Sequence, residues 1–185
     1  MAEEDRDRWD KKYRNSHFIP SKIAEVVEKH YHFSGGITAL DIACGTGRNS
    51  KFLAKKGFEV EALDISPVAL LELKDLENIY PKEVDFDSYR LKEDSYNLIV
   101  CTYYLNRSLF PQIKKALKKG GIFIFETFMH HPENTKVPSN RSFLLEEGEL
   151  ERIFSDNYEI LYLNGFMDTI SCGDRAMKAS IVIRK

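Results

Sequence analysis

The chain has 185 residues, of which 43% are hydrophobic, with 27 Lys and Arg against 29 Asp and Glu. This length predicts one domain with a sizeable core, spanning residues 1–185. The formal net charge of −2 gives no overall basic character, so we expect no nucleic-acid partner.

The cysteines and the apolar runs indicate the compartment. Cys44, Cys101 and Cys172 are too few and too widely spaced for a disulfide framework. The charged stretch from Met1 to Trp9 predicts no signal peptide, and no run elsewhere approaches the roughly 18 apolar residues that cross a bilayer. We therefore expect a cytoplasmic monomer or homodimer with reduced thiols and no membrane partner.

Short apolar runs alternate with amphipathic stretches along the chain. An N-terminal helical segment covers residues 1–34, where apolar residues follow Pro20-Ser21 at spacings of three and four. The predicted strands are 37–43, 58–64, a weak 82–86, 96–102, 122–127, 158–163 and 178–183. The predicted helices between them are 49–56, 66–78 with a cap at Ser66-Pro67, and 109–119.

This alternation predicts an α/β fold with helices on both faces of a doubly wound, mostly parallel sheet of seven strands. No clear helix flanks the two late strands, so they are expected to pair antiparallel, with the last strand antiparallel in the sheet. Ligands of such sheets bind outside the carboxyl ends of the strands. Functional residues are therefore expected directly after each strand.

Two glycines, Gly45 and Gly47, follow the first strand and open a helix. They allow a tight turn and a close approach of the backbone to a ligand. Asp41 lies four residues before Gly45, and Asp64 ends the second strand, where an acid can accept hydrogen bonds from ribose hydroxyls. An ordinary strand–turn–helix corner is the alternative interpretation.

Two kinds of nucleotide ligand fit such a loop. The third small residue of a dinucleotide fingerprint is Ser50 here, and a helix N-terminus would face the pyrophosphate. A carboxylate at Asp41 suits an ammonium group better than an oxyanion. S-adenosylmethionine has an ammonium, a sulfonium and a ribose, and it fits both acids.

The segment Leu40–Asn49, together with Asp64, resembles motif I and its companion acid in class I S-adenosylmethionine-dependent methyltransferases. The resemblance implies a seven-stranded Rossmann-like fold and S-adenosylmethionine as cofactor. It also implies Asp85 at the adenine amine and the Phe86 backbone beside the ring. The cofactor-binding residues implied in this way are Asp41, Ala43, Gly45, Gly47, Asn49, Asp64, Ile65, Asp85, Phe86, Thr102 and Tyr13. Ala43, Asn97 and Lys119 depart from the usual Gly, Asp and Pro of the family.

The subgroup that the chain resembles is the tellurite-resistance methyltransferase-like proteins. The residues that carry this resemblance are Cys44 to Ser50 and Phe143 to Leu150. It implies a small-molecule substrate.

Residues on the acceptor side follow less directly from the pattern. Trp9 to Tyr13 resembles a segment that folds over the cofactor as a lid, although an amphipathic helix that packs Trp9 on the core is an equal alternative. The long loop Phe128 to Phe143, within a substrate-side segment 128–145, is typical of a lid or binding loop. Candidate catalytic residues are Tyr103, His131 and Arg141. The other candidates are His130, Glu126, Tyr104 and Arg107. The alternative for the loop candidates is an ordinary solvated loop residue, and Tyr104 and Arg107 could equally be surface residues.

The sequence therefore predicts methyl transfer from S-adenosylmethionine to a small acceptor, such as a thiol or a species derived from a chalcogen oxyanion. A non-catalytic S-adenosylmethionine-binding protein and a nicotinamide-dependent oxidoreductase are the alternatives. No metal site is expected, because His30 and His32 have no Asp or Cys partner at ligand spacing.

Overall fold

The computed structural model describes residues 2–15, 21–169 and 173–185. The strands are β1 (Thr38–Ile42), β2 (Glu59–Asp64), β3 (Ile79–Glu83), β4 (Tyr96–Thr102), β5 (Leu117–Phe128), β6 (Glu159–Thr169) and β7 (Arg175–Arg184). The α-helices are α1 (Ala2–Asn15), α2 (Glu25–His30), α3 (Arg48–Lys55), α4 (Pro67–Leu70), α5 (Leu109–Ala116) and α6 (Glu149–Phe154). Short 3-10 helices are η1 (Tyr31–Phe33), η2 (Leu71–Leu73) and η3 (Arg141–Phe143).

The seven strands form one sheet in the order β3-β2-β1-β4-β5-β7-β6. Strand β7 runs antiparallel to both of its neighbours, β5 and β6, and the remaining pairs are parallel. The predicted fold class, a doubly wound and mostly parallel seven-stranded sheet, is confirmed. The order reverses between β1 and β4, and this switch point lies at the centre of the carboxyl-terminal edge.

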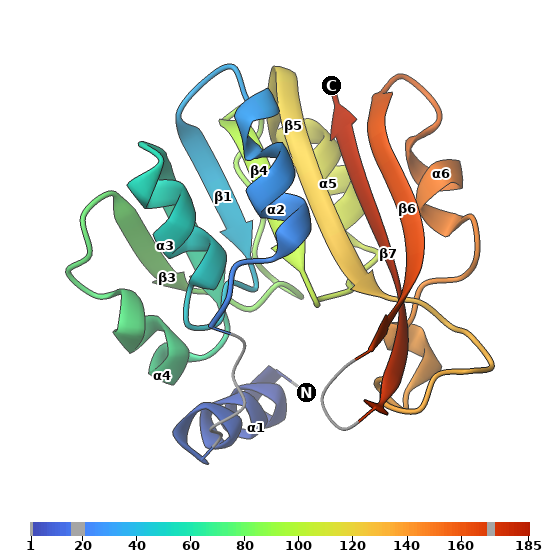
Figure 1. Ribbon diagram of the computed structural model, residues 1–185. Helices are drawn as coiled ribbons and strands as arrows, with labels where there is room; N and C mark the ends of the chain where they lie inside the picture. Colours follow the sequence, from blue (N-terminus) through green and yellow to red (C-terminus); the bar gives the residue numbers. More distant parts are fainter. Residues whose placement is uncertain (1, 16–20, 170–172) are drawn as a thin grey trace.

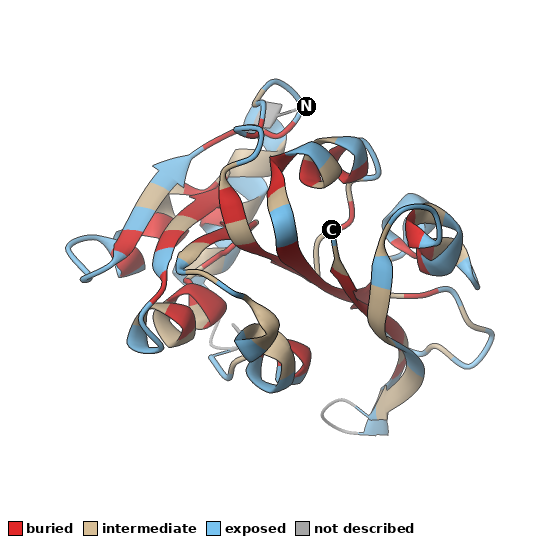
Figure 2. Ribbon diagram, turned by 90° about the horizontal axis from the view of Figure 1, so that it is seen from above, coloured by how far each residue is buried: buried red, intermediate tan, exposed pale blue. Residues whose placement is uncertain are grey.

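Helices cover both faces of the sheet (Figure 1). Val27 of α2 and Leu53 of α3 pack on one face against strand residues such as Val100. On the other face, Phe110 of α5 and Phe154 of α6 pack with the strand side chains of the second hydrophobic cluster. Figure 2 shows the buried residues concentrated in the strands between these two layers. Burying the central strands on both faces explains their nearly continuous apolar sequences.

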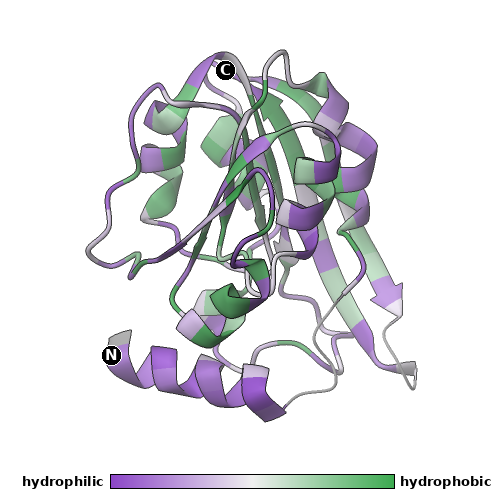
Figure 3. Cartoon of the chain, turned by 90° about the vertical axis from the view of Figure 1, so that its left-hand side faces the viewer, coloured by the Kyte–Doolittle hydropathy of each residue, from purple (hydrophilic) through white to green (hydrophobic). Residues whose placement is uncertain are grey.

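Helix α1 lies across the carboxyl-terminal edge of the sheet, below the ends of the parallel strands (Figure 1). It is strongly hydrophilic along most of its surface (Figure 3). Trp9 is half-buried and stacks on Tyr13 at a centroid distance of 5.9 Å. Trp9 is not among the members of the three hydrophobic clusters. Residues 16–20, which belong to the predicted N-terminal segment 1–34, lie outside the described residues.

Several element boundaries differ from those predicted. The helix predicted over 66–78 ends after η2, because Asp75 and Asn78 adopt φ angles of 63° and 60° that no α-helix accommodates. The third strand begins at Ile79 rather than 82, since Ile79 is buried and pairs with Val60. The helix predicted over 109–119 ends at Ala116, because Leu117 pairs with Tyr96 and begins β5.

The last third of the chain contains more regular structure than predicted. A short helix, α6, precedes β6, although no clear helix was expected there. Strands β6 and β7 extend to 11 and 10 residues, because they continue as a hairpin beyond the end of β5. Their antiparallel pairing is as predicted.

Cys44 and Cys101 are buried free thiols, while Cys172 lies outside the described residues. Of the helices within the ranges described, none is long and apolar enough to cross a membrane.

Candidate functional site

The loop between β1 and α3 turns through left-handed backbone conformations. Ala43, Gly45 and Gly47 have φ angles of 53°, 56° and 74°. A Cβ at Gly47 would lie 2.2 Å from Leu73 Cδ2, and one at Gly45 would lie 2.6 Å from the Tyr13 hydroxyl. The two glycines are therefore required both by backbone conformation and by space. Ala43 adopts the same conformation in spite of its Cβ.

Asp64 ends β2 beside this loop and is held in place by the backbone. One carboxylate oxygen accepts from the Gly45 N–H at 2.7 Å, and the other accepts from the Ser66 N–H at 2.9 Å. Burial raises the pKa of Asp64 above its ordinary value, although these backbone hydrogen bonds oppose the rise. The carboxylate has further acceptor capacity, since each oxygen carries two lone pairs.

Asp41 lies beneath the loop and is almost fully buried. It accepts a hydrogen bond of 2.6 Å from the Ser50 hydroxyl. Burial raises the pKa of Asp41 to about 7, with the Ser50 hydrogen bond and the Arg48 charge acting against this rise. A buried carboxylate without an ion-pair partner is costly, and a cationic ligand group beside the loop would relieve that cost.

Helix α1 closes over the same loop. The Asp10 carboxylate accepts a hydrogen bond from the Ser66 hydroxyl, and the Tyr13 hydroxyl lies against Gly45. Burial raises the pKa of Tyr13, and the charge of Asp64 raises it further, so the hydroxyl is a donor at neutral pH. The sequence placed Tyr13 at the cofactor, and the structure brings it to the glycine loop and Asp64.

A groove of about 550 Å³ runs between α1 and the ends of β2 and β3. Its lining residues are Glu3, Arg6, Ile65, Glu83, Val84 and Asp85. Two residues predicted for the cofactor, Ile65 and Asp85, thus share one groove. Phe86 is buried, packs on Tyr104 at a centroid distance of 5.6 Å and does not line the groove.

On the other side of the loop, α3 contacts the end of β4. Asn49 donates through Nδ2 to the Thr102 hydroxyl at 3.0 Å, and Arg48 donates to the same oxygen at 3.2 Å. The structure therefore joins Asn49 and Thr102, which the sequence had placed separately near the cofactor. It also brings in Arg48, which the sequence analysis did not single out.

Tyr103 follows Thr102 and lies among buried polar groups. Its hydroxyl donates to Glu126 at 3.1 Å and accepts from the Lys178 ammonium at 2.9 Å. Sequence reasoning missed Lys178. The available signal was a Lys two residues before Ser180 in an otherwise apolar strand, since both side chains then share one face.

His131 and Arg141 lie in the loop after β5 and form local contacts. His131 Nδ1 accepts from the Glu133 N–H at 3.2 Å. Arg141 is exposed and forms a two-pronged ion pair with Glu146, at 3.1 and 2.9 Å. The described contacts therefore tie both residues to their own loop.

The sheet order and the glycine loop with its two acids define the fold of class I S-adenosylmethionine-dependent methyltransferases. The structure resembles the crystal structure of TehB from Haemophilus influenzae with a TM-score of 0.74 and 27% identity, covering 97% of this chain and 66% of that chain. An S-adenosylmethionine-dependent methyltransferase from Mesorhizobium loti shares the fold, with a TM-score of 0.64 at 20% identity over 82% of this chain and 92% of that chain.

Residues 1–178 match the family model described as "Tellurite resistance protein TehB". A curated Haemophilus influenzae relative, named "Probable S-adenosyl-L-methionine-dependent methyltransferase TehB", is 32% identical over 136 residues, which cover 68% of this chain and 47% of the relative. The chain belongs to the TehB family, as the sequence resemblance implied. It spans about half the length of the curated relatives that it matches.

The residues present fit S-adenosylmethionine, the cofactor in the names of these relatives. Two glycines whose Cβ atoms would collide with their neighbours leave a backbone cradle, and a buried carboxylate lies beneath it. The Asp64 carboxylate retains lone pairs that are not used by its backbone hydrogen bonds, as a hydroxyl-bearing ligand requires. A pyrophosphate would instead meet two carboxylates and fits less well.

Proposed function

We propose that this protein transfers a methyl group from S-adenosylmethionine to a small-molecule acceptor. The observation that carries the proposal is the pair of buried carboxylates, Asp41 and Asp64, at the ends of β1 and β2 next to the Gly45–Gly47 turn. This arrangement offers one acid to an ammonium group and another to ribose hydroxyls.

The acceptor class is a thiol or a reduced chalcogen species. The family description names tellurite resistance, and this supports a chalcogen acceptor. We further propose that the protein acts in the cytoplasm as a monomer or homodimer, on small molecules rather than nucleic acids.

When bound, the cofactor supplies a methyl carbon activated by its sulfonium. The chain's own residues bind and orient: Asp64 holds the ribose, Asp41 the ammonium, and Asp85 the adenine amine in the groove. Helix α1 covers the loop through Tyr13 and excludes water. Holding a nucleophile in line with an activated carbon contributes several kcal/mol to lowering the barrier.

The segment 128–145 forms the acceptor side in this proposal, with Tyr103, His131 and Arg141 as candidate catalytic residues. Tyr103 is the best placed of the three, because it directly follows Thr102 at the end of β4. His131 and Arg141 would reach an acceptor only if the loop rearranged away from Glu133 and Glu146.

Calorimetry tests the cofactor half of the proposal. We expect the protein to bind S-adenosylhomocysteine with micromolar affinity, and NAD no better than background. Asp64→Ala should weaken binding about 10- to 100-fold, the loss expected for a hydrogen bond to a charged group. Asp156→Ala, an exposed acid in the turn before β6, is the matched control and should bind normally.

A radiolabelled methyl-transfer screen tests the catalytic half, with thiols, tellurite, selenite, phenols and carboxylates as acceptors. Methylation of a thiol or chalcogen species supports the proposal. Heat with NAD alone would favour the oxidoreductase alternative. Cofactor binding without transfer to any acceptor would favour a non-catalytic binding protein.

A further inference from the structure

Helix α1 presents one stripe of side chains to the ends of three strands. Arg6, Asp10 and Tyr13 follow one another at spacings of four and three residues, so they lie on one side of the helix. Between Arg6 and Tyr13 the helix rises by about 10 Å. The neighbouring strands β3, β2 and β1 span the same distance, about 10 Å from the first to the third.

Each side chain of this stripe contacts a different strand end. Arg6 forms an ion pair at 3.8 Å with Glu83, the last residue of β3. Asp10 accepts a hydrogen bond from the hydroxyl of Ser66, two residues after β2. Tyr13 lies against the glycine loop that follows β1. The rise of the helix is therefore in register with the spacing of the strands.

Polar contacts rather than a hydrophobic face hold α1 on the sheet. None of its described side chains belongs to a hydrophobic cluster, and most of its surface is hydrophilic (Figure 3). The pair between Arg6 and Glu83 is partly exposed, and such pairs contribute little. Asp10 is only 8% exposed, and a buried carboxylate needs a hydrogen-bond donor. The Asp10 contact therefore stabilises the docking of α1 more than the Arg6 pair does.

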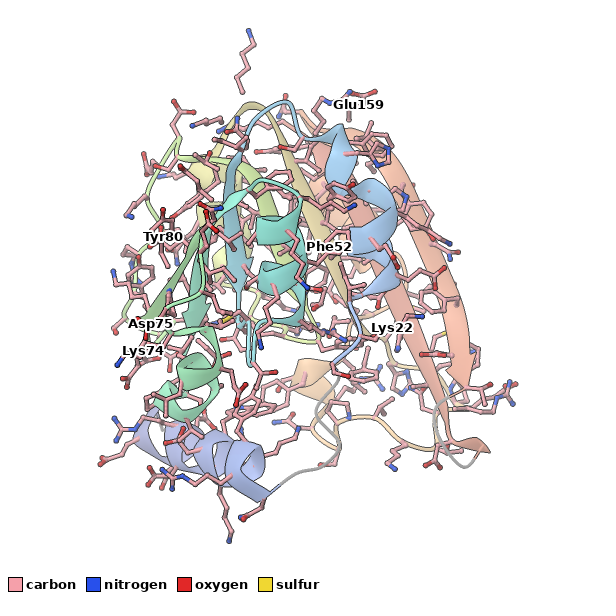
Figure 4. The ribbon with its side chains drawn as sticks, turned by 60° about the vertical axis from the view of Figure 1, so that its left-hand side comes forward. Lys22, Phe52, Lys74, Asp75, Tyr80 and Glu159 are labelled. Carbon is pink, nitrogen blue, oxygen red and sulfur yellow. The ribbon has the colours of Figure 1, made fainter. Side chains whose placement is uncertain are left out.

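Ser66 joins Asp10 to the acid that ends β2. Its hydroxyl donates to Asp10, and its N–H donates to Asp64 at 2.9 Å. The same hydroxyl accepts from the Ala69 N–H at 3.2 Å and so caps α4, which contacts α1 (Figure 4). Since a serine has a single O–H, Ser66 gives its only side-chain donor to α1. A chain of hydrogen bonds thus runs from α1 through Ser66 to Asp64.

The two carboxylates on this chain also influence each other. Burial raises the pKa of Asp64, and the nearby charge of Asp10 adds a smaller rise. Ser66 makes this arrangement tolerable because it donates one hydrogen bond to each acid. A ligand hydroxyl that donates to Asp64 would favour its charged form and offset the repulsion from Asp10.

We propose that Asp10 is a positioning residue for the cofactor, acting through Ser66 on Asp64, so that docking of α1 and binding of the ribose favour each other. This inference rests on the proposed function, in which Asp64 holds the ribose hydroxyls. Thermodynamic linkage makes the effect reciprocal: the factor by which docked α1 strengthens cofactor binding is the factor by which bound cofactor stabilises the docking. The cofactor is enclosed by a helix that it helps to hold in place.

Calorimetry with S-adenosylhomocysteine tests the Asp10 contact. Asp10→Ala should weaken binding about 5- to 100-fold, the usual range of coupling between two sites. Asp10→Asn keeps an acceptor oxygen for Ser66 and should retain most of the affinity. Ser66→Ala breaks the same hydrogen bond from the other side, and it decides the matter if Asp10→Ala does not fold by circular dichroism. Asp7→Ala, which removes an exposed acid of the same helix, is the matched control and should bind normally.

A double-mutant cycle separates positioning from an independent contribution of α1. If Asp10 acts through Asp64, Asp10→Ala should cost less than about twofold in affinity once Asp64 is already alanine, because the group that it positions is gone. The same factor in both backgrounds would overturn the proposal, since it would show that the two residues act independently.

The fluorescence of Trp9 reports the docking of α1 directly. Trp9 is the only tryptophan of the chain, directly precedes Asp10 and is half-buried. We expect Asp10→Ala to raise the acrylamide quenching constant of Trp9 in the free protein, and Asp10→Asn and Asp7→Ala to leave it near the wild-type value. Equal quenching in wild type and Asp10→Ala would contradict the role of Asp10 in docking.

The outcomes distinguish this inference from the proposed function. Normal binding of S-adenosylhomocysteine by Asp10→Ala would overturn the coupling and leave the proposed function intact. Failure of the wild type to bind S-adenosylhomocysteine would refute the proposed function and the coupling with it.

Discussion

At the scale of single residues, Asp41 is the group whose charge depends most on its surroundings. Burial moves its pKa from 3.8 to about 7, so between about pH 4 and pH 7 the folded state holds a proton that the unfolded chain releases. The contribution of Asp41 to the free energy of unfolding therefore falls as the pH rises through this window. Asp41→Asn should be more stable than wild type at pH 8 in urea unfolding, and the difference should shrink towards pH 4.

The same pKa predicts a pH-dependent affinity. If the ligand's ammonium pairs with ionised Asp41, S-adenosylhomocysteine should bind about tenfold more weakly at pH 6 than at pH 8, because one acid with a pKa near 7 changes from mostly ionised to mostly protonated. Calorimetry in buffers of different ionisation enthalpy should detect proton release at pH 6. Asp41→Asn should bind more weakly and lack this release; a variant with the wild-type pH profile would contradict the role of Asp41.

Ala43 and Gly47 give a matched pair of backbone predictions in one loop. Ala43 has a φ of 53° and a Cβ that disfavours this conformation, so Ala43→Gly should raise the free energy of unfolding by about 0.5–1 kcal/mol. Gly47→Ala should lower it by about 2 kcal/mol or more, since its Cβ would meet Leu73 at 2.2 Å. Urea unfolding of both variants measures the two effects. Shifts of the same sign would show that backbone strain does not limit this loop.

At the scale of elements, Arg107 fixes the loop that follows β5. Its guanidinium pairs with Glu149 at the start of α6, at 2.6 and 2.9 Å, and donates to the carbonyls of Ser142 and Leu144. Four hydrogen bonds from one side chain thus join the turn after β4, the end of the loop and α6. The sequence offered Arg107 only as a residue of uncertain role, because its partners are 35 to 42 positions away.

Arg107→Met should loosen this loop. Because the guanidinium is partly exposed, we expect a loss of only about 1–2 kcal/mol in the free energy of unfolding. Limited proteolysis should cut the segment 128–145 several-fold faster. Arg141→Met breaks a more exposed pair in the same loop and should change stability by less than about 0.5 kcal/mol. Equal protection of the loop in both variants would mean that Arg107 does not anchor it.

The bounds of an element were predicted most accurately where its sequence has a long, continuous apolar run. Strand β4 was predicted with its observed bounds, since its apolar run is continuous from Leu98 to Cys101. The helix after Ser66 was extended too far, because amphipathic spacing cannot reveal the positive φ of Asp75 and Asn78. Helix α6 was missed because its six residues form fewer than two helical turns, which is too short for a clear amphipathic pattern.

At the scale of the whole molecule, ligand binding should raise the thermal stability of the entire fold. A ligand at 100 times its Kd stabilises the native state by about 2.7 kcal/mol, which corresponds to about 5–10 °C in Tm for a protein of this size. We expect S-adenosylhomocysteine to produce this shift in differential scanning calorimetry and NAD to produce none. A shift with NAD alone would exclude the proposed cofactor site.

Local sequence patterns located the glycine loop and its two acids but gave no sign of the buried polar side chains around Tyr103. Asp41, Gly45 and Gly47 lie within seven residues of each other, so spacing alone reveals them. The hydrogen-bonded side chains of Tyr103, Glu126 and Lys178 come from the end of β4, from β5 and from β7, and Lys178 is 75 positions from Tyr103. These side chains meet only because β4, β5 and β7 are neighbours in the sheet, and a local sequence pattern does not reveal which distant strands pair.

Because β7 lies between β5 and β6, the sheet can be completed only at a late stage of synthesis. The ribosome makes β6 before β7, yet β6 pairs only with β7 in the described sheet. A nascent chain that has emerged as far as β6 therefore has β6 unpaired and the edge of β5 open. Both can pair with strands of other chains and so promote aggregation. The sheet is completed only when β7 leaves the exit tunnel and inserts between them, so Lys178 reaches Tyr103 late, after the glycine loop and its acids can already have formed.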